Sequence, residues 1–298
     1  MVFDNLSTGH RRLVQWGEFF KGDLANPGDL SRCFKKYKIS AVIHFAASIA
    51  VPESVVDPAK YYRNNVTNTL NLLDAMRAAK VKKLIFSSTA ATYGDPVKNP
   101  IREIHPQRPI NPYGRTKLMC EQVMADYCAA YGLKYVALRY FNASGADPVG
   151  EIGPMQKEET HLIPIVLDAA MGRRLCVNIF GSNYKTPDGT CRRDYVHVAD
   201  LATAHLLALR YLDKGGKSDV FNLGNGRGFS VLEVIKTAGK VTGLKIPFKI
   251  SSRRFGDPAE LVAASSRARS VLGWRPEYAD LETIINHAWV WHRKQLGG

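Results

Sequence analysis

The chain has 298 residues, of which 45% are hydrophobic and 23% charged, and its formal net charge is +14. This composition is typical of a globular protein with a sizeable core, and no apolar run approaches the roughly 20 residues that a membrane span needs. The positive charge comes in short scattered clusters, such as Arg11-Arg12 and Arg253-Arg254, which opposes a nucleic-acid-binding protein because such proteins gather their charge on one face.

The cysteines, the histidines and the first residues bear on the cellular compartment. The five cysteines form no close pair, so they predict free thiols in a reducing cytoplasm and neither a disulfide frame nor a zinc site. The eight histidines show no spacing typical of metal ligands. The first twelve residues lack the apolar stretch of a signal peptide. We expect a cytoplasmic protein that binds no metal, membrane or nucleic acid.

Short apolar runs alternate with amphipathic stretches along the first half of the chain. Strands are expected at 1–4, 41–47, 83–88 and 134–141. Helices are expected at 27–38, 57–80 and 111–132. Strands that alternate with helices predict an α/β fold, a Rossmann-like doubly wound parallel sheet.

The texture of the sequence changes near residue 150. Two polar stretches, at 150–164 and 180–195, predict long loops of the kind that usually serve function. Helices are expected at about 163–172, 198–213, 230–242 and 279–295, with a strand at 220–224. We therefore predict a dinucleotide-binding domain at 1–150, to which segments from about 176 to 224 return, and a smaller lobe at 151–298 that mainly binds substrate.

The sequence NPYGRTK places Tyr113 and Lys117 four residues apart, on one face of the helix predicted at 111–132. An ammonium beside a phenol stabilises the phenolate and lowers the pKa of the tyrosine from its usual value near 10. Taken alone, such a pair is more often solvated helix surface. The hydroxyl run Ser87-Ser88-Thr89, placed after an apolar strand, favours a general base with a group that orients it.

Asp4 ends the first predicted strand. A carboxylate there can accept both hydroxyls of a ribose diol and would repel a 2′-phosphate, which favours NAD over NADP, although a turn aspartate with capping duty has the same pattern. A glycine-rich turn that binds pyrophosphate would come before this aspartate. Only three residues precede Asp4, so we expect either that the first strand, turn and helix of such a domain are absent from this chain or that the chain has lost pyrophosphate binding. The glycines from Gly224 to Gly228 follow a late strand and are no substitute.

Ten segments together resemble the extended short-chain dehydrogenase/reductase family and, within it, the UDP-glucose 4-epimerases. They are DNLSTGHR, FKGDL, VIHFAASIAVPESVVDPAKYYRNNV, FSSTAATYG, NPYGRTK, LRYFNASGADP, HLIP, IFGSNYKTPDGTCRRDYVHVADLA, FNLGNG and RRFGDPAELVA. The resemblance implies that Tyr113, Lys117 and Thr89 are catalytic and that NAD is the cofactor.

The resemblance also implies two sets of binding residues. The cofactor would contact Asp4, Asn5, Ser7, Thr8, Gly9, Asp23, Leu24, Phe45, Ala46, Ala47, Ile49, Asn65, Ser87, Tyr113, Lys117, Tyr140 and Phe141. Ile49 stands where some members of the family have a lysine. The UDP-sugar would contact Ser88, Thr89, Asn142, His161, Leu162, Asn178, Ile179, Phe180, Arg193, Tyr195, Arg254, Asp257 and Leu261. Arg193 and Arg254 suit a diphosphate, because a guanidinium fork binds phosphate oxygens bidentately.

The residues after Thr89 bear on the reaction. Dehydratases of this family have an Asp-Glu pair there, and decarboxylases tend to place a glutamate nearby. Ala90-Ala91 cannot transfer protons, which favours reversible epimerisation of UDP-glucose and UDP-galactose at C4 through a 4-keto intermediate. Two alternatives stay open: another NAD-dependent sugar-nucleotide or steroid-type oxidoreductase, and a UDP-sugar binder without catalysis.

Two further expectations follow from the resemblance. Leu261 stands where family members have a residue that restricts N-acetylated sugars, and leucine is smaller than tyrosine, so UDP-N-acetyl hexosamines could also be substrates. Family members commonly pair through two long helices, which here would be 58–79 and 112–131, so a homodimer is expected.

Overall fold

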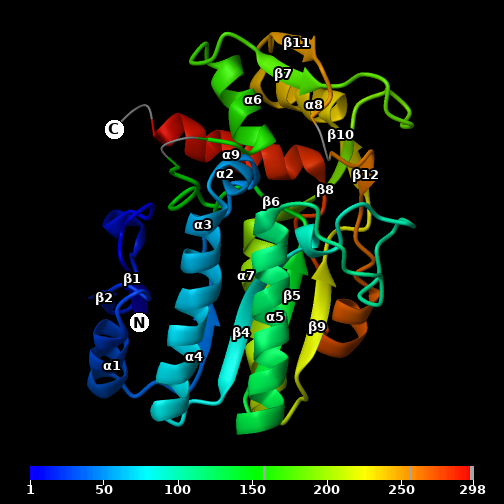
Figure 1. The fold of residues 1–298 in the computed structure, drawn as a ribbon. Coiled ribbons are helices and arrows are strands. Elements are labelled where there is room, and N and C mark those ends of the chain that lie inside the picture. Colours follow the sequence, from blue (N-terminus) through cyan, green and yellow to red (C-terminus); the bar gives the residue numbers. More distant parts are fainter. Residues whose placement is uncertain (157–158, 255–256, 296–298) are drawn as a thin grey trace. The chain divides into compact units, whose positions relative to one another are not determined.

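The chain folds into two units in a computed structural model that describes residues 1–156, 159–254 and 257–295 (Figure 1). The first unit is made of Met1–Gly94, Pro106–Arg139 and His205–Phe221. The second unit is made of Asp95–His105, Tyr140–Ala204 and Asn222–Gly298, apart from the undescribed positions. The chain therefore crosses between the units several times, and α7 (Val198–Asp213) and β9 (Asp219–Leu223) contribute residues to both.

Parallel strands form the frame of the first unit. A two-stranded parallel sheet contains β1 (Val2–Asp4) and β2 (Phe19–Lys21). A second sheet has the order β3 (Val42–His44), β4 (Lys83–Thr89), β5 (Lys134–Tyr140) and β9, and its first pair is parallel. The carboxyl ends of β1 and β2 lie together, and so do those of β3 and β4. Such strand ends are where α/β sheets bind ligands.

Helices pack their apolar residues against β4. The helices of this unit are α1 (Pro27–Lys36), α2 (Val51–Val56), α3 (Pro58–Tyr61), α4 (Asn68–Ala78) and α5 (Pro112–Tyr131). A π-helical segment, Tyr62–Thr67, joins α3 to α4. The core contains Leu30 of α1, Leu73 of α4, Phe86 of β4 and Met124 of α5.

The second unit has its own core of helices and short strands. Its strands are β6 (Asn142–Ser144), β7 (Val177–Phe180), β8 (Arg192–His197), β10 (Gly228–Ser230), β11 (Phe248–Ser251) and β12 (Glu260–Leu261). Its helices include α6 (Leu162–Ala170), α8 (Val231–Thr242) and α9 (Leu281–Lys294). The strand β8 pairs with β6, β10 and β12, and β7 pairs with β11. The central strand β8 thus gathers the segments that were predicted to bind substrate.

Most predicted elements are confirmed, but four expectations were wrong in detail. The strand expected at 41–47 ends at His44, and the following Phe45 is exposed and packs on the ring of His205. The helix expected at 57–80 is α3, the π-helical segment and α4. The last residues of the loop expected at 180–195 form the start of β8. Charged residues there made the sequence look like a loop, but in the structure they have partners, since Arg192 Nη1 lies 2.7 Å from Glu260 Oε1.

The loop expected at 150–164 is shorter than predicted, since α6 begins at Leu162. Residues 157 and 158 of this loop lie outside the described residues, as do residues 255 and 256 of the segment RRFGDPAELVA. Across the part of the chain that is described, no helix has the length and apolar content to cross a membrane.

Candidate active site

The start of α5 fixes the positions of Tyr113 and Lys117. The side chain of Asn111 accepts a hydrogen bond from the backbone N–H of Gly114 at 2.9 Å, and Pro112 occupies the first helical position. This cap and proline together favour helix initiation at this point of the sequence. Tyr113 and Lys117 therefore lie in the first two turns of α5, on the same face.

Lys117 is buried, with 3% of its surface exposed. Its Nζ donates a hydrogen bond to the backbone carbonyl of Ser87 at 2.8 Å and lies 4.8 Å from the centre of the Phe86 ring. Burial lowers the pKa of Lys117 to about 8, against the opposing effects of Cys120 and Glu121. The ammonium thus joins α5 to the end of β4 and keeps most of its charge at neutral pH.

The hydroxyl run at the end of β4 is also placed by hydrogen bonds. The hydroxyl of Thr89 accepts the backbone N–H of Ala91 at 3.1 Å. The hydroxyl of the buried Ser88 donates to the carboxylate of Glu121. Its hydrogen-bonding need is therefore met within the protein, without a ligand. The geometry brings Ser87 and Lys117 together, whereas a meeting of the Tyr113 phenol with Lys117 and Thr89 stays a prediction.

Asn65 ties the loop after β3 to α5. Its amide accepts the backbone N–H of Ser48 at 2.8 Å and donates to the Ser48 carbonyl at 3.0 Å and the Thr116 hydroxyl at 3.1 Å. The loop contains the predicted cofactor residues Phe45, Ala46, Ala47 and Ile49. Asn65 therefore supports this loop through both of its amide atoms, and a contact with nicotinamide stays a prediction.

The ends of β1 and β2 place two carboxylates in neighbouring turns. Asp4, the last residue of β1, accepts the backbone N–H of Leu6 at 2.6 Å, where Leu6 has a φ of 60°. The amide of Asn5 donates to Asp23 at 2.9 Å. A Cβ on Gly9 would lie 3.3 Å from an oxygen of Asp4. The prediction that a strand ends at Asp4 is confirmed, and its half-buried carboxylate retains lone pairs for further donors.

His44, the last residue of β3, lies in the core next to Phe86. Its Nε2 is 3.0 Å from the hydroxyl of Thr69, and burial together with Lys117 lowers its pKa to about 3. It is therefore a neutral core histidine. In residues 1–156, 159–254 and 257–295 no cluster of three or more histidine, cysteine or acidic side chains has the arrangement of a metal site.

In the second unit, β7 presents an aromatic ring and an unpaired acceptor. The guanidinium of Arg254 lies 3.7 Å from the centre of the Phe180 ring. The buried Oδ1 of Asn178 accepts no hydrogen bond from any residue that the structure describes, although buried acceptors in proteins nearly always have a donor. The side chain of Ile179, between them, is in the core, so a ligand could reach Ile179 only through its backbone.

The strands around β8 bring other predicted residues together. Arg193 lies 3.4 Å from a carboxylate oxygen of Asp257 and opposite Leu261 of β12. Tyr195 is buried in the core and lies opposite Asn142 of β6. These pairings bring Arg193, Asp257 and Leu261 close to one another. A contact of the three with a UDP-sugar stays a prediction.

Three other predicted residues lie near the ends of elements in this unit. His161 precedes the first residue of α6, Leu162, and its ring is 2.8 Å from Glu159. Tyr140 ends β5 and Phe141 lies between β5 and β6. Contacts of these residues with a ligand stay predictions.

The glycines from 224 to 228 surround a buried carboxylate. Asp194, fully buried, accepts the backbone N–H groups of Asn225 at 2.8 Å, Gly226 at 3.0 Å and Ala263 at 3.1 Å. A Cβ on Gly224 would lie 2.5 Å from this carboxylate. The glycines therefore allow a turn to wrap around Asp194.

Sequence reasoning overlooked the buried pair of Glu121 and Arg139. The Nε of Arg139 lies 3.0 Å from one carboxylate oxygen of Glu121 and 3.2 Å from the other. Two signals were available: Glu121 lies four residues after Lys117 on the same helix, and Arg139 interrupts the apolar strand predicted at 134–141.

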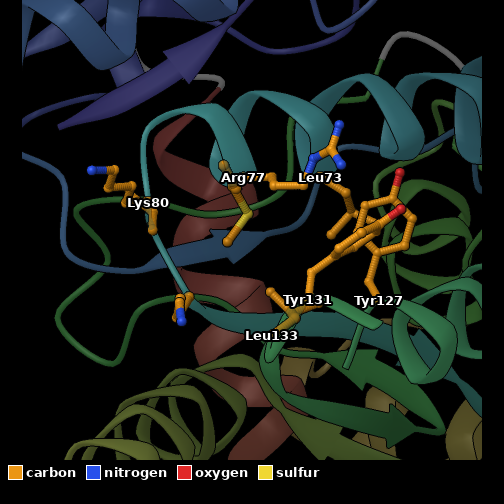
Figure 2. A pocket seen from close by; sticks show the side chains of 9 residues that line it. Leu73, Arg77, Lys80, Tyr127, Tyr131 and Leu133 are labelled. Atoms are coloured by element: carbon orange, nitrogen blue, oxygen red, sulfur yellow. The ribbon is translucent and has the colours of Figure 1, made fainter. Parts of the chain in front are cut away.

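A hollow of about 250 Å³ lies at the other end of α5, and Figure 2 shows the side chains that line it. It is lined by Leu73, Met76, Arg77, Lys80, Val81, Lys82, Tyr127, Tyr131 and Leu133. Eighteen residues of helix separate Tyr113 from Tyr131, which corresponds to about 27 Å along the axis. This hollow is therefore distinct from the predicted catalytic residues.

Comparisons with known proteins agree with the geometry of both units. Residues 1–224 match the model of the NAD dependent epimerase/dehydratase family. The chain is 53% identical over 298 residues to a UDP-glucose 4-epimerase of Halalkalibacterium halodurans, with 100% of the chain and 89% of the relative covered.

Two solved structures are similar throughout. One is a UDP-glucose 4-epimerase from Brucella ovis in complex with NAD, with 53% identity and a TM-score of 0.94 over 96% of this chain and 88% of that one. The other, from Bifidobacterium longum in complex with NAD⁺ and UDP, has 39% identity and a TM-score of 0.93 over 99% and 91%.

Proposed function

Because the chain belongs to the NAD dependent epimerase/dehydratase family, we propose that it is an NAD-dependent enzyme that interconverts UDP-glucose and UDP-galactose by epimerisation at C4. The observation that supports this most is the attachment of the Tyr-x-x-x-Lys helix to the hydroxyl-bearing end of β4, through Lys117 Nζ and the carbonyl of Ser87. The relatives that the chain resembles over 88 to 91% of their length are all described as UDP-glucose 4-epimerases.

Tyr113 is the general base of this proposal. Its phenolate removes the proton of the sugar 4-hydroxyl, directly or through the hydroxyl of Thr89, and returns it after the sugar has turned. The ammonium of Lys117, held at 2.8 Å from the Ser87 carbonyl, stabilises the phenolate by its charge. Because burial lowers the pKa of Lys117 to about 8, this support weakens in alkaline solution.

The residues at the strand ends fit NAD. The half-buried carboxylate of Asp4 at the end of β1 suits a ribose diol, with Asn5 and Asp23 in the neighbouring turns. When bound, NAD supplies the acceptor and the donor of the hydride at C4. Asn65 positions the loop from Phe45 to Ile49, which would line the cofactor.

The second unit has the groups that a uridine diphosphate needs. Arg193 and Arg254 would bind the diphosphate, because guanidinium groups pair with phosphate oxygens. The unpaired Oδ1 of Asn178 would accept a hydrogen bond from the nucleotide, beside the Phe180 ring. Fixed in this way, the diphosphate would anchor the substrate while its sugar turns over.

The two alternatives are less well supported than epimerisation. Ala90 and Ala91 follow Thr89 in a short 3₁₀ turn and provide no further acid or base. A non-catalytic binder would not require a buried lysine tied to the end of β4. An oxidoreductase with net hydride transfer would release NADH, whereas epimerisation regenerates NAD in each cycle.

Tyr113→Phe tests the proposal directly. We expect turnover of UDP-glucose to UDP-galactose to fall about 100- to 10,000-fold, because the general base is lost. The measurement is the initial rate with added NAD, and the thermal unfolding midpoint of the variant provides the control for folding. The matched control is Tyr131→Phe, which removes a phenol hydroxyl at the far end of α5 and should leave the rate unchanged. Near-normal turnover by Tyr113→Phe would refute the assignment.

Leu261 supports a wider choice of sugar. It is half-buried on β12 opposite Arg193, and we propose that its small side chain admits UDP-N-acetylglucosamine. Leu261→Tyr should reduce turnover of the N-acetylated substrate at least about tenfold, since it adds bulk beside the sugar, and should affect UDP-glucose less. Equal effects on the two substrates, or no turnover of UDP-N-acetylglucosamine by the wild type, would contradict this proposal.

We also propose that the enzyme is a cytoplasmic homodimer. The five cysteines are free thiols, which suits a reducing compartment. The long helices α4 and α5 would form the contact, and Met119 of α5 is 41% exposed. Light scattering should give twice the mass of one chain, and Met119→Glu should shift the protein toward the single chain.

A further inference from the structure

The buried pair of Glu121 and Arg139 lies directly under the end of β4. Glu121 is 5% exposed and Arg139 is 4% exposed. The Nε and Nη2 of Arg139 both donate to the Glu121 carboxylate, and Nη1 donates to the hydroxyl of Tyr93 at 2.9 Å. The hydroxyl of Ser88 donates to the same carboxylate.

The helix α5 brings this pair to the predicted catalytic residues. Tyr113, Lys117 and Glu121 are spaced by four residues each, so they follow one face of the helix. Lys117 contacts the carbonyl of Ser87 and Glu121 contacts the side chain of Ser88. Two successive turns of α5 therefore hold two successive residues of β4, immediately before Thr89.

Stability alone is a poor explanation for such a pair. Two buried charges lose so much hydration that well-packed apolar residues of the same volume are often equally or more stabilising. The pair has instead a specific arrangement, in which the guanidinium fork fixes the carboxylate and the carboxylate fixes Ser88. Its place beside Lys117 suggests that its charge matters as well.

We propose that Glu121 and Arg139 are positioning residues for the catalytic groups, fixing the end of β4 and holding Lys117 as an ammonium. This inference rests on the proposed function. The negative charge of Glu121 opposes the burial that lowers the pKa of Lys117. Arg139 keeps Glu121 in place, and Glu121 in turn holds the Ser88 hydroxyl in the core.

Glu121→Gln tests both parts, because it keeps the shape of the side chain and removes its charge. We expect kcat to fall about 10- to 100-fold with less than a threefold change in KM, since a small misplacement of reacting groups affects the rate strongly. Without the carboxylate, and with Arg139 still charged, Lys117 should lose its proton at lower pH. The alkaline limb of the kcat profile should then move to lower pH by at least about half a unit.

A second variant separates geometry from charge. Arg139→Lys keeps the positive charge but loses the planar fork. It should lower kcat while the alkaline limb stays close to that of the wild type. Asp213→Asn is the matched control, because it breaks a surface ion pair of the same unit, Lys83 Nζ to Asp213 Oδ1 at 2.6 Å, and should leave both readouts unchanged.

A readout that needs no turnover keeps this test separate from the proposed function. NMR of protein labelled at the lysine side-chain carbons follows the titration of Lys117 whether or not the wild type is active, and Lys117→Arg identifies its signal. If Glu121→Gln folds poorly, the double variant Glu121→Gln/Arg139→Met, which leaves no unpaired guanidinium, is titrated instead. A lower Lys117 titration point in the variant supports the inference. A titration point, kcat and alkaline limb equal to those of the wild type would overturn it, even if the unfolding midpoint falls.

Discussion

Burial decides the charge of several individual residues. Lys117 and His44 are both in the core of the first unit, and burial lowers both pKa values, to about 8 and about 3. The consequences at neutral pH differ: the lysine remains largely charged and the histidine is neutral. The sequence predicts that Tyr113 and Lys117 act together, from their spacing combined with the hydroxyl run that ends at Thr89. Of this arrangement the structure shows the hydrogen bond from Lys117 to Ser87. The sequence could not indicate that Asp194 is buried, because its three backbone donors come from distant segments.

The buried His44 predicts a pH dependence of stability. Its pKa is lower in the folded chain than in the unfolded chain, where it is near 6.5, so the unfolded state binds more protons between these values. Its contribution is therefore full above pH 6.5 and is progressively lost as the pH falls below that. Between pH 7.5 and 5.5 this loss is about 1 kcal/mol.

His44→Gln should remove this contribution. Urea unfolding gives the free energy of unfolding at pH 7.5 and at pH 5.5. The decrease in this free energy between the two pH values should be smaller by about 1 kcal/mol in the variant than in the wild type. His10→Gln provides the control for loss of a histidine outside the core. The same difference in wild type and His44→Gln would show that His44 is not protonated on unfolding.

Among the elements, those with local signals were predictable and those held by distant partners were not. The apolar run of β4 and the cap and proline of α5 are visible in the sequence, and both elements formed as expected. The first residues of β8 were predicted as loop. The partner that stabilises Arg192 in this strand is Glu260, which is 68 residues away and so gives no local signal. The π-helical segment from Tyr62 to Thr67 was also missed. Such segments are rare and often lie at functional sites.

The π-helical segment predicts a structural role for Asn65. Asn65→Ala removes four side-chain hydrogen bonds and leaves the backbone N–H and carbonyl of Ser48 without this partner. The free energy of unfolding should fall by about 2 to 3 kcal/mol, measured by urea unfolding. Arg63→Ala in the same segment, where the side chain is exposed, is the control and should lose less. Equal losses in the two variants would contradict this role.

At the scale of the whole molecule, the two units divide the predicted groups. The first unit has the predicted catalytic residues Tyr113, Lys117 and Thr89, together with Asp4 at the end of β1 and Asp23 shortly after β2. The second has Arg193, Arg254 and Asn178. The overall α/β class was predictable from the alternation of strands and helices. The exact membership of each unit was not, because the second unit takes residues 95–105 from within the first half of the chain.

The central claim is that the chain returns the C4 hydrogen of its substrate to the same carbon. The most direct measurement is NMR of the products formed from UDP-glucose labelled with deuterium at C4, with purified protein and unlabelled NAD. The proposed function predicts UDP-galactose that retains deuterium at C4 while no free NADH accumulates. Absence of UDP-galactose, loss of the label to solvent, or release of NADH in proportion to turnover would contradict it.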